Sequence, residues 1–222
     1  VSLGSDTTLN TTNGGNAAGA AITLGAITSN ARILTLNAGT GGAISGSSYA
    51  GGGDLTITNS AGTAFSGAIN AGTVNLLNTT GTIAFNGALT ATTLGTAAQA
   101  FNLQLNGGGT ITNAVTFTNT GTLTLGNDAS DNLAFTGGAT VASPTSINLA
   151  GTVSAAGTGV LSLAKPINVT ADATIGGTST GGITLGAATL ADGATLTVGA
   201  GANTALGLSS ITGTAGGTTS NL

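Results

Sequence analysis

The chain has 222 residues, of which 40% are hydrophobic and only 4% are charged, and its net charge is −4. Globular domains usually carry about 25% charged residues. The two cations, Arg32 and Lys165, are too few to neutralise a phosphate backbone, so we expect neither nucleic acid nor an anionic membrane surface as a partner. Without cysteine no disulfide can form, and no apolar run reaches the roughly 18 residues of a membrane-spanning helix.

The N-terminal stretch, residues 1–19, is polar and rich in Gly, Asn and Thr. It predicts an edge segment with one short strand at residues 7–11. Regular alternation of apolar and polar residues begins near Ala20. Residues 41–53 are rich in Gly and Ser and carry Tyr49, the only tyrosine. We interpret this stretch as a loop that leaves the regular structure, and Tyr49 as its candidate ligand-binding residue.

Five segments between residues 31 and 125 repeat one pattern, in which a short alternation is followed by Asn and then by Gly or Thr. Alternation is the period of a strand, and Asn and Gly tolerate left-handed turn geometry. Residues 64–69 recur as residues 84–89, and an offset of about twenty residues is typical of a solenoid repeat. The predicted structural turn positions are Asn37, Asn59, Asn78, Asn106 and Asn119.

These features predict an all-β fold, a single-domain parallel β-helix over residues 1–222 with rungs of about 20 residues and essentially no α-helix. About ten rungs at a spacing of about 4.8 Å would make a rod roughly 50 Å long. The low charge fits such a stack, because like charges at that spacing repel by about 1 kcal/mol even in water. The stretch 207–222 is a Gly/Thr/Ser-rich C-terminal edge, in which Ile211 is the last expected core residue. Phenylalanines recur at a similar interval and predict an internal stack: Phe65, Phe85, Phe101, Phe117 and Phe135.

Residues that carry chemistry are scarce in this chain. His, Cys and Glu are absent from the sequence, so the usual pairs of nucleophile and base cannot be assembled and we expect no enzyme. The one close pair of carboxylates is Asp128 and Asp131, which we interpret as a turn with side-chain caps. A calcium site is the alternative, because residues 126–133 resemble the calcium-binding nonapeptide of RTX toxins without its double glycine. No other cofactor is expected, and Asp54, Asp172 and Asp192 are expected to cap turns.

Thr-x-Thr pairs are the sequence feature that could bind ice, since a flat ladder of such pairs can order water. The pairs in this chain do not keep one position relative to the Asn/Gly turn, so we interpret them as outward-facing strand residues. They lie at Thr56/Thr58, Thr90/Thr92, Thr110/Thr112, Thr116/Thr118, Thr122/Thr124 and Thr195/Thr197.

The repeat units, such as residues 53–59 and 121–127, resemble the β-strand repeats of giant bacterial surface proteins. These include autotransporter passengers, filamentous-haemagglutinin-like adhesins and rickettsial surface antigens. The resemblance covers residues 20 to about 207. It implies a parallel β-helix exported to the cell surface by a Gram-negative bacterium. Because the chain begins at Val1 without a signal peptide, we expect it to be a processed or excised piece.

Two classes of function remain after these exclusions. The first is structural: an extracellular fibre subunit or adhesin shaft. The chain would then be either a fragment of a longer passenger domain or a subunit that polymerises head to tail through its end rungs. A host or neighbouring-cell surface would be the partner of an adhesin. The second class is a binding module that uses a Thr/Asn face to hold ice or a glycan. A flat cross-β amyloid shares the composition, but the irregular stretches around Tyr49 and Asp128 favour a coiled solenoid.

Overall fold

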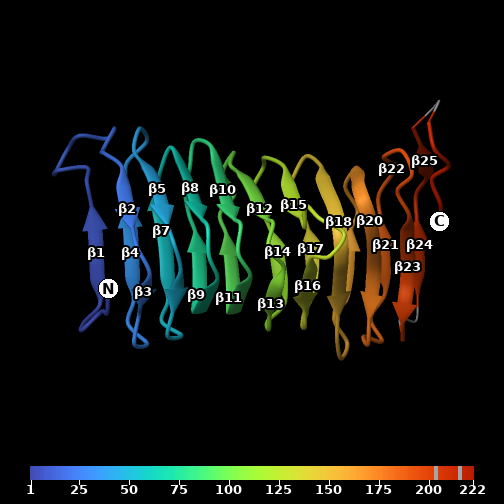
Figure 1. The fold of residues 1–222 in the computed structure, drawn as a ribbon, viewed down its shortest axis with the longest axis horizontal. Coiled ribbons are helices and arrows are strands. Elements are labelled where there is room, and N and C mark those ends of the chain that lie inside the picture. The colour runs from blue at the N-terminus through green and yellow to red at the C-terminus, as the bar shows by residue number, and fades with distance from the viewer. Residues whose placement is uncertain (203–204, 215–216) are drawn as a thin grey trace.

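The computed structural model describes residues 1–202, 205–214 and 217–222, and these form a parallel β-solenoid of about nine turns. Figure 1 shows the turns side by side along the long axis, with the two ends of the chain at opposite ends of the stack. No helix occurs in the described residues. The predicted all-β solenoid is therefore confirmed. Nine turns rather than ten, at about 4.8 Å each, give a stack about 43 Å long.

Each full turn contributes three strand segments, and their parallel pairing with the turns on either side builds three faces. The first face contains β2 (Ile22–Leu24), β5 (Ala43–Gly46), β8 (Gly62–Phe65), β10 (Thr82–Phe85), β12 (Asn102–Leu105), β15 (Leu123–Leu125), the beginnings of β18 (Ile147–Ala155) and β20 (Ile167–Gly177), β22 (Ala188–Leu190) and β25 (Ile211–Gly213). The second contains β3 (Ile27–Thr28), β6 (Tyr49–Ala50), the beginnings of β9 (Ile69–Leu76) and β11 (Leu89–Thr96), β13 (Gly109–Ile111), β16 (Asn132–Phe135), the ends of β18 and β20, and β23 (Leu196–Gly201). The third contains β1 (Thr7–Asn10), β4 (Leu34–Asn37), β7 (Leu55–Asn59), the ends of β9 and β11, β14 (Val115–Phe117), β17 (Gly138–Val141), β19 (Val160–Leu163), β21 (Ile183–Leu185) and β24 (Leu206–Leu208).

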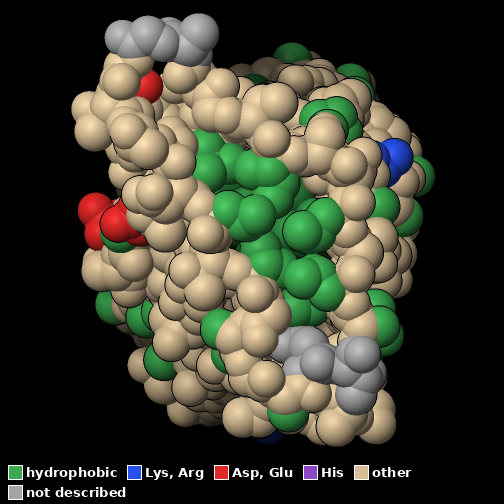
Figure 2. All heavy atoms as spheres, turned by 90° about the vertical axis from the view of Figure 1, so that its right-hand side faces the viewer, with side chains coloured by type: hydrophobic (Ala, Val, Ile, Leu, Met, Phe, Trp, Pro, Cys, Tyr) green, Lys and Arg blue, Asp and Glu red, His purple; other side chains and the backbone are tan. Residues whose placement is uncertain are grey.

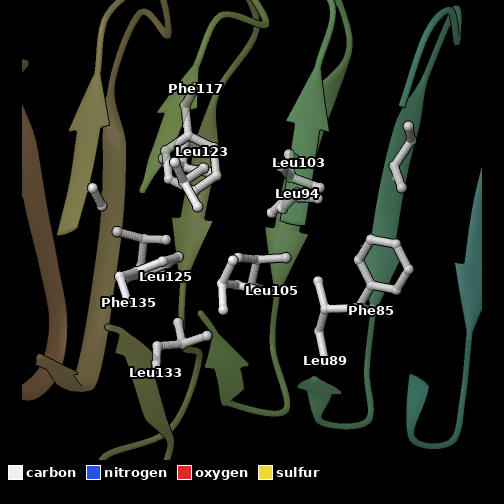
Figure 3. Close-up of a cluster of buried hydrophobic side chains, with 14 of the residues drawn as sticks. Phe85, Leu89, Leu94, Leu103, Leu105, Phe117, Leu123, Leu125, Leu133 and Phe135 are labelled. Carbon is white, nitrogen blue, oxygen red and sulfur yellow. The ribbon is translucent and has the colours of Figure 1, made fainter. Parts of the chain in front are cut away.

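The strand alternation sends apolar side chains inward, where each stacks on its equivalent in the next turn. In β10, for example, Ile83 and Phe85 are fully buried, and they pair in register with Leu103 and Leu105 of β12. All five phenylalanines are buried, as the sequence predicts. The rings of Phe65 and Phe85 stack with centroids 6.0 Å apart, and Phe117 and Phe135 meet edge to face at 5.8 Å. Figure 3 shows these columns of Leu and Phe filling the interior between the faces.

The strand ladder of the third face is interrupted once, between β11 and β14. The five strands that begin with β14 form a sheet of their own, whereas the other strands belong to one 20-stranded sheet. A side chain bridges the interruption, because the N–H of Thr118 donates to Oγ1 of Thr96 at 2.9 Å. The first and second faces run without a break past this point.

The predicted loop at residues 41–53 is wrong, and so is the interpretation of Tyr49 as a ligand-binding residue. This stretch forms β5 and β6 inside the stack, and Tyr49 is fully buried in register with Ile27 and Ile69. Small residues are required here for packing: a Cβ on Gly46 would overlap the ring of Phe65 in the next turn. Close contact between turns therefore accounts for Gly42, Gly46 and Gly53, whereas Gly51 and Gly52 have positive φ where the chain turns between β6 and β7.

The two predicted edge segments form part of the solenoid. In residues 1–19, β1 pairs with β4, and Ser2 bridges to Thr28 on the second face. In residues 207–222, Ile211 packs partly buried against the core, as expected, and Asn221 bridges to Thr195. Residues 215–216 of that C-terminal segment lie outside the described residues.

Candidate functional site

The five predicted Asn turn positions occupy two corners of the solenoid. Asn37 and Asn59 end strands of the third face, Asn78 and Asn119 follow strands of that face, and Asn106 follows β12 on the first face. Oδ1 of Asn37 accepts the N–H of Gly39 at 3.1 Å, which closes a side-chain turn. Nδ2 of Asn106 donates to Oδ1 of Asn86 in the previous turn at 2.9 Å. These contacts give Asn37 a role in turn geometry and Asn106 a role in joining turns.

Buried polar side chains lie inside the corner between the third and first faces, and the sequence did not reveal them. The hydroxyls of Ser60 and Thr79 are 2.9 Å apart in consecutive turns, and Ser60 also bonds Thr63 at 3.0 Å. Two turns further on, fully buried Asn119 donates to the carbonyl of Phe101 at 3.1 Å. The recurrence of Ser, Thr or Asn at one place in the repeat was the available signal.

The carboxylates of Asp128 and Asp131 close their own turn. Oδ2 of Asp131 accepts the N–H groups of Asn127 and Asp128 at 2.8 and 3.0 Å. Oδ1 of Asp128 accepts the N–H and the hydroxyl of Ser130 at 2.9 and 2.7 Å, and these two bonds lower the pKa of Asp128. Calcium takes six to eight oxygen ligands. No cluster of three or more potential metal-ligating side chains occurs in the described part of the chain, so the geometry favours the turn interpretation.

Asp54, Asp172 and Asp192, which are expected to cap turns, each accept a hydrogen bond from the turn that follows. Oδ1 of Asp54 accepts the N–H of Thr73 at 2.7 Å, and Oδ1 of Asp172 accepts the N–H of Thr195 at 2.8 Å. Asp192 accepts the hydroxyl of Thr214 at 3.1 Å. Each carboxylate thus joins two consecutive turns.

The Thr-x-Thr pairs are distributed over all three faces and do not form one flat array. Outward threonines do align on the third face, but in a column that is a single residue wide. Its two parts are Thr8, Thr35 and Thr56, and then Thr116, Thr140, Ser162 and Thr184. Such a column fits the interpretation of Thr as an outward strand former.

The two end turns expose strand edges and, at one end, the apolar interior. Within the described residues, β24 and β25 are hydrogen-bonded on one side only, to β21 and β22. Leu206 and Leu208 of β24 are 50% and 41% exposed, although their partners in β21 are buried. Figure 2 looks onto this end and shows hydrophobic side chains gathered in its middle, surrounded by backbone and other side chains. At the other end, β1 and β2 are outermost, with Leu9 and Leu24 partly buried.

No described helix is long and apolar enough to cross a membrane. Comparisons of the chain with protein-family models, with curated proteins and with solved structures gave no match.

Proposed function

We propose that this chain is a non-enzymatic structural protein, a β-solenoid segment of an extracellular fibre or adhesin shaft on a bacterial surface. The observation that carries the proposal is the C-terminal end turn, where Leu206 and Leu208 continue the buried core columns into an exposed surface. Parallel strand edges and an apolar centre are complementary to another solenoid turn. We therefore propose that the segment assembles head to tail through its end turns.

A second copy of the chain supplies a matching surface at its N-terminal end. Extending the observed register places β24 against β1 of the next copy and β25 against β2. Gly213 would then oppose Leu24, which repeats the pairing of Gly46 with Leu24 inside the chain. On the second face, Asn221 would approach Ser2. A contact of this heterologous type adds subunits without closing a ring, which produces a filament.

The outer surface supports an extracellular role. Nearly all outward positions carry Thr, Asn, Ser, Ala or Gly, and trypsin would find only Arg32 and Lys165 in the whole sequence. The aspartates join one turn to the next through hydrogen bonds to the following backbone. A shaft of this kind would present an adhesive element to a host or neighbouring cell.

Sedimentation velocity over a range of concentrations tests the end-to-end assembly. We expect the purified chain to form species that grow with concentration, because the end turns bury apolar surface when they stack. The variant Leu208→Asp places a carboxylate in the contact and should remain monomeric. Leu77→Asp is the matched control, because Leu77 is similarly exposed, at 43%, but lies on the side of the solenoid. A wild-type chain that stays monomeric at high concentration would contradict the assembly.

A further inference from the structure

A polar groove crosses the outside of the first face near its corner with the second face. It has a volume of about 440 Å³ and is lined by Gln104, Asn106, Thr124, Asn127, Asn148 and Thr170, with Gly126 among them. The lining residues come from four consecutive turns, those of β12, β15, β18 and β20. Three spacings of about 4.8 Å make the groove about 14 Å long.

The strand register explains why this part of the face is hollow. Gln104, Thr124, Asn148 and Asn168 occupy one outward column, each paired with the next. The short Thr124 therefore lies between two longer amide side chains, and it is only 8% exposed although it points outward. Beside it, Gly126 is buried and adds no side chain to the floor.

A fixed loop stands beside the groove. The turn that joins β15 to β16 includes residues 127–131, and Asn127 in this loop lines the groove. Asp131 holds the loop by accepting the N–H groups of Asn127 and Asp128. A wall that is already ordered binds a ligand without a further entropic cost for its own ordering.

The groups that face the groove are uncharged amides and hydroxyls. Oδ1 of Asn148 accepts Nδ2 of Asn168 at 3.2 Å, which leaves the amide NH₂ of Asn148 for a ligand. Within the described residues, the side-chain amide of Gln104 makes no hydrogen bond. Amides provide donors and acceptors side by side, which suits the adjacent hydroxyls of a sugar, since each of these also donates and accepts. The carboxylates of Asp128 and Asp131 near the rim repel anionic ligands.

From this arrangement we propose that the groove binds a short, uncharged oligosaccharide. The proposal goes beyond the structural role, because a shaft with such a groove on its side would itself hold glycan. The groove extends across four turns, so it is long enough for several sugar units and longer than one monosaccharide would fill. Hydrogen bonds dominate the contact, so the affinity of one groove is low, and a filament would present many grooves together.

Titration of the full-length Leu208→Asp chain, which is expected to stay monomeric, with neutral tetrasaccharides, followed by two-dimensional NMR, tests the proposal. The probes are cellotetraose, maltotetraose and tetra-N-acetylchitotetraose, with tetragalacturonate as the anionic comparison. We expect at least one neutral probe to shift the amide signals of residues 104–106, 124–127 and 148, and tetragalacturonate to leave them unchanged. Absence of such shifts with all three neutral probes, or a preference for tetragalacturonate, would overturn it.

Variants then locate the site and separate it from the assembly. Gln104→Ala and Asn148→Ala should each weaken binding of the neutral probe about five- to tenfold, since each removes a polar contact. Asn70→Ala is the matched control, an exposed outward Asn on the second face that lies outside the groove. Binding unchanged in both groove variants would also overturn the proposal. Leu208→Asp should bind the probe like the wild-type chain, so a failure of end-to-end assembly is distinguishable from a failure of glycan binding.

Discussion

Tyr49 carries its hydroxyl into the interior of the solenoid, where it ties two consecutive turns together. The oxygen lies 3.1 Å from the carbonyl of Arg32 and 2.9 Å from that of Asp54. Fully buried Ser29 lies nearby, at the corner between the second and third faces. Its Oγ accepts the N–H of Gly53 at 2.9 Å. Polar groups at this corner therefore satisfy one another and stabilise the wall of the solenoid.

Tyr49→Phe keeps the ring and removes the hydroxyl. Because the part-buried hydrogen bond to the carbonyl of Arg32 or Asp54 is then lost, we expect the free energy of unfolding to fall by about 0.5–1.5 kcal/mol. Urea unfolding followed by circular dichroism measures this change. An unchanged midpoint would show that the hydroxyl contributes nothing to stability.

Stability should also depend on pH through Tyr49. Burial raises the pKa of its hydroxyl, Asp54 raises it further, and the hydrogen bond with Ser29 partly opposes both. The unfolded chain therefore releases this proton near pH 10, at a lower pH than the folded chain. The contribution of the protonated Tyr49 hydroxyl to the free energy of unfolding is fully present below about pH 10 and is lost as the pH rises above it. Unfolding midpoints between pH 8 and 11 should show this decline in the wild-type chain, and the Tyr49→Phe variant should show less of it.

Ala31 adopts a backbone conformation that suits glycine. Its φ is +59° and that of its neighbour Asn30 is +54°, in the left-handed region that costs a residue with a Cβ about 1–2 kcal/mol. Ala31 is exposed, so little packing would be lost on removing its methyl group. We expect Ala31→Gly to raise the free energy of unfolding by about 0.5–1 kcal/mol, after the larger entropy of glycine in the unfolded chain is subtracted. A lower unfolding midpoint for Ala31→Gly would contradict this explanation.

At the scale of the strand and its turn, consecutive turns are in direct backbone contact at the corner between the first and second faces. A Cβ on Gly87 would overlap the carbonyl carbon of Gly67 in the turn before, and one on Gly107 would overlap Gly87. None of these three glycines has a positive φ. Their requirement is therefore the space between turns and not an unusual backbone conformation.

Gly87→Ala should accordingly destabilise the solenoid by about 1–3 kcal/mol, since the stack must separate locally to admit the methyl group. Gly4→Ala is the control, because nothing lies within 4 Å of a Cβ built there. Thermal unfolding of the two variants should show a large loss of Tm for Gly87→Ala and almost none for Gly4→Ala. Equal losses of Tm would mean that the destabilisation comes from replacing glycine as such and not from a clash between the new methyl group and the neighbouring turn.

The sequence was sufficient to predict the strands, the repeat and the parallel pairing, because the alternation at Leu55 and Ile57 recurs at Val74 and Leu76 and each pair faces the same core. It was insufficient for residues 41–53, where Gly and Ser have the same composition in a loop and in a tightly packed strand. Only the position of Phe65 in the next turn distinguishes these cases. The groove beside Gln104 also escaped prediction, because it depends on how side chains of four turns align.

At the scale of the whole molecule, each turn contacts mainly the turns before and after it, so the stack can be extended without changing its interior. The apolar columns run from Leu3 to Leu196 as one core cluster, and the last turn carries them to the surface at Leu206 and Leu208. The third-face interruption between β11 and β14 leaves the other two faces continuous.

Electron microscopy of the purified chain, with no partner added, tests the central claim most directly. The proposed assembly predicts unbranched filaments one solenoid wide, with an axial strand spacing of about 4.8 Å. The Leu208→Asp variant should give separate rods about 43 Å long under the same conditions. Separate short rods of the wild-type chain at high concentration would contradict end-to-end assembly.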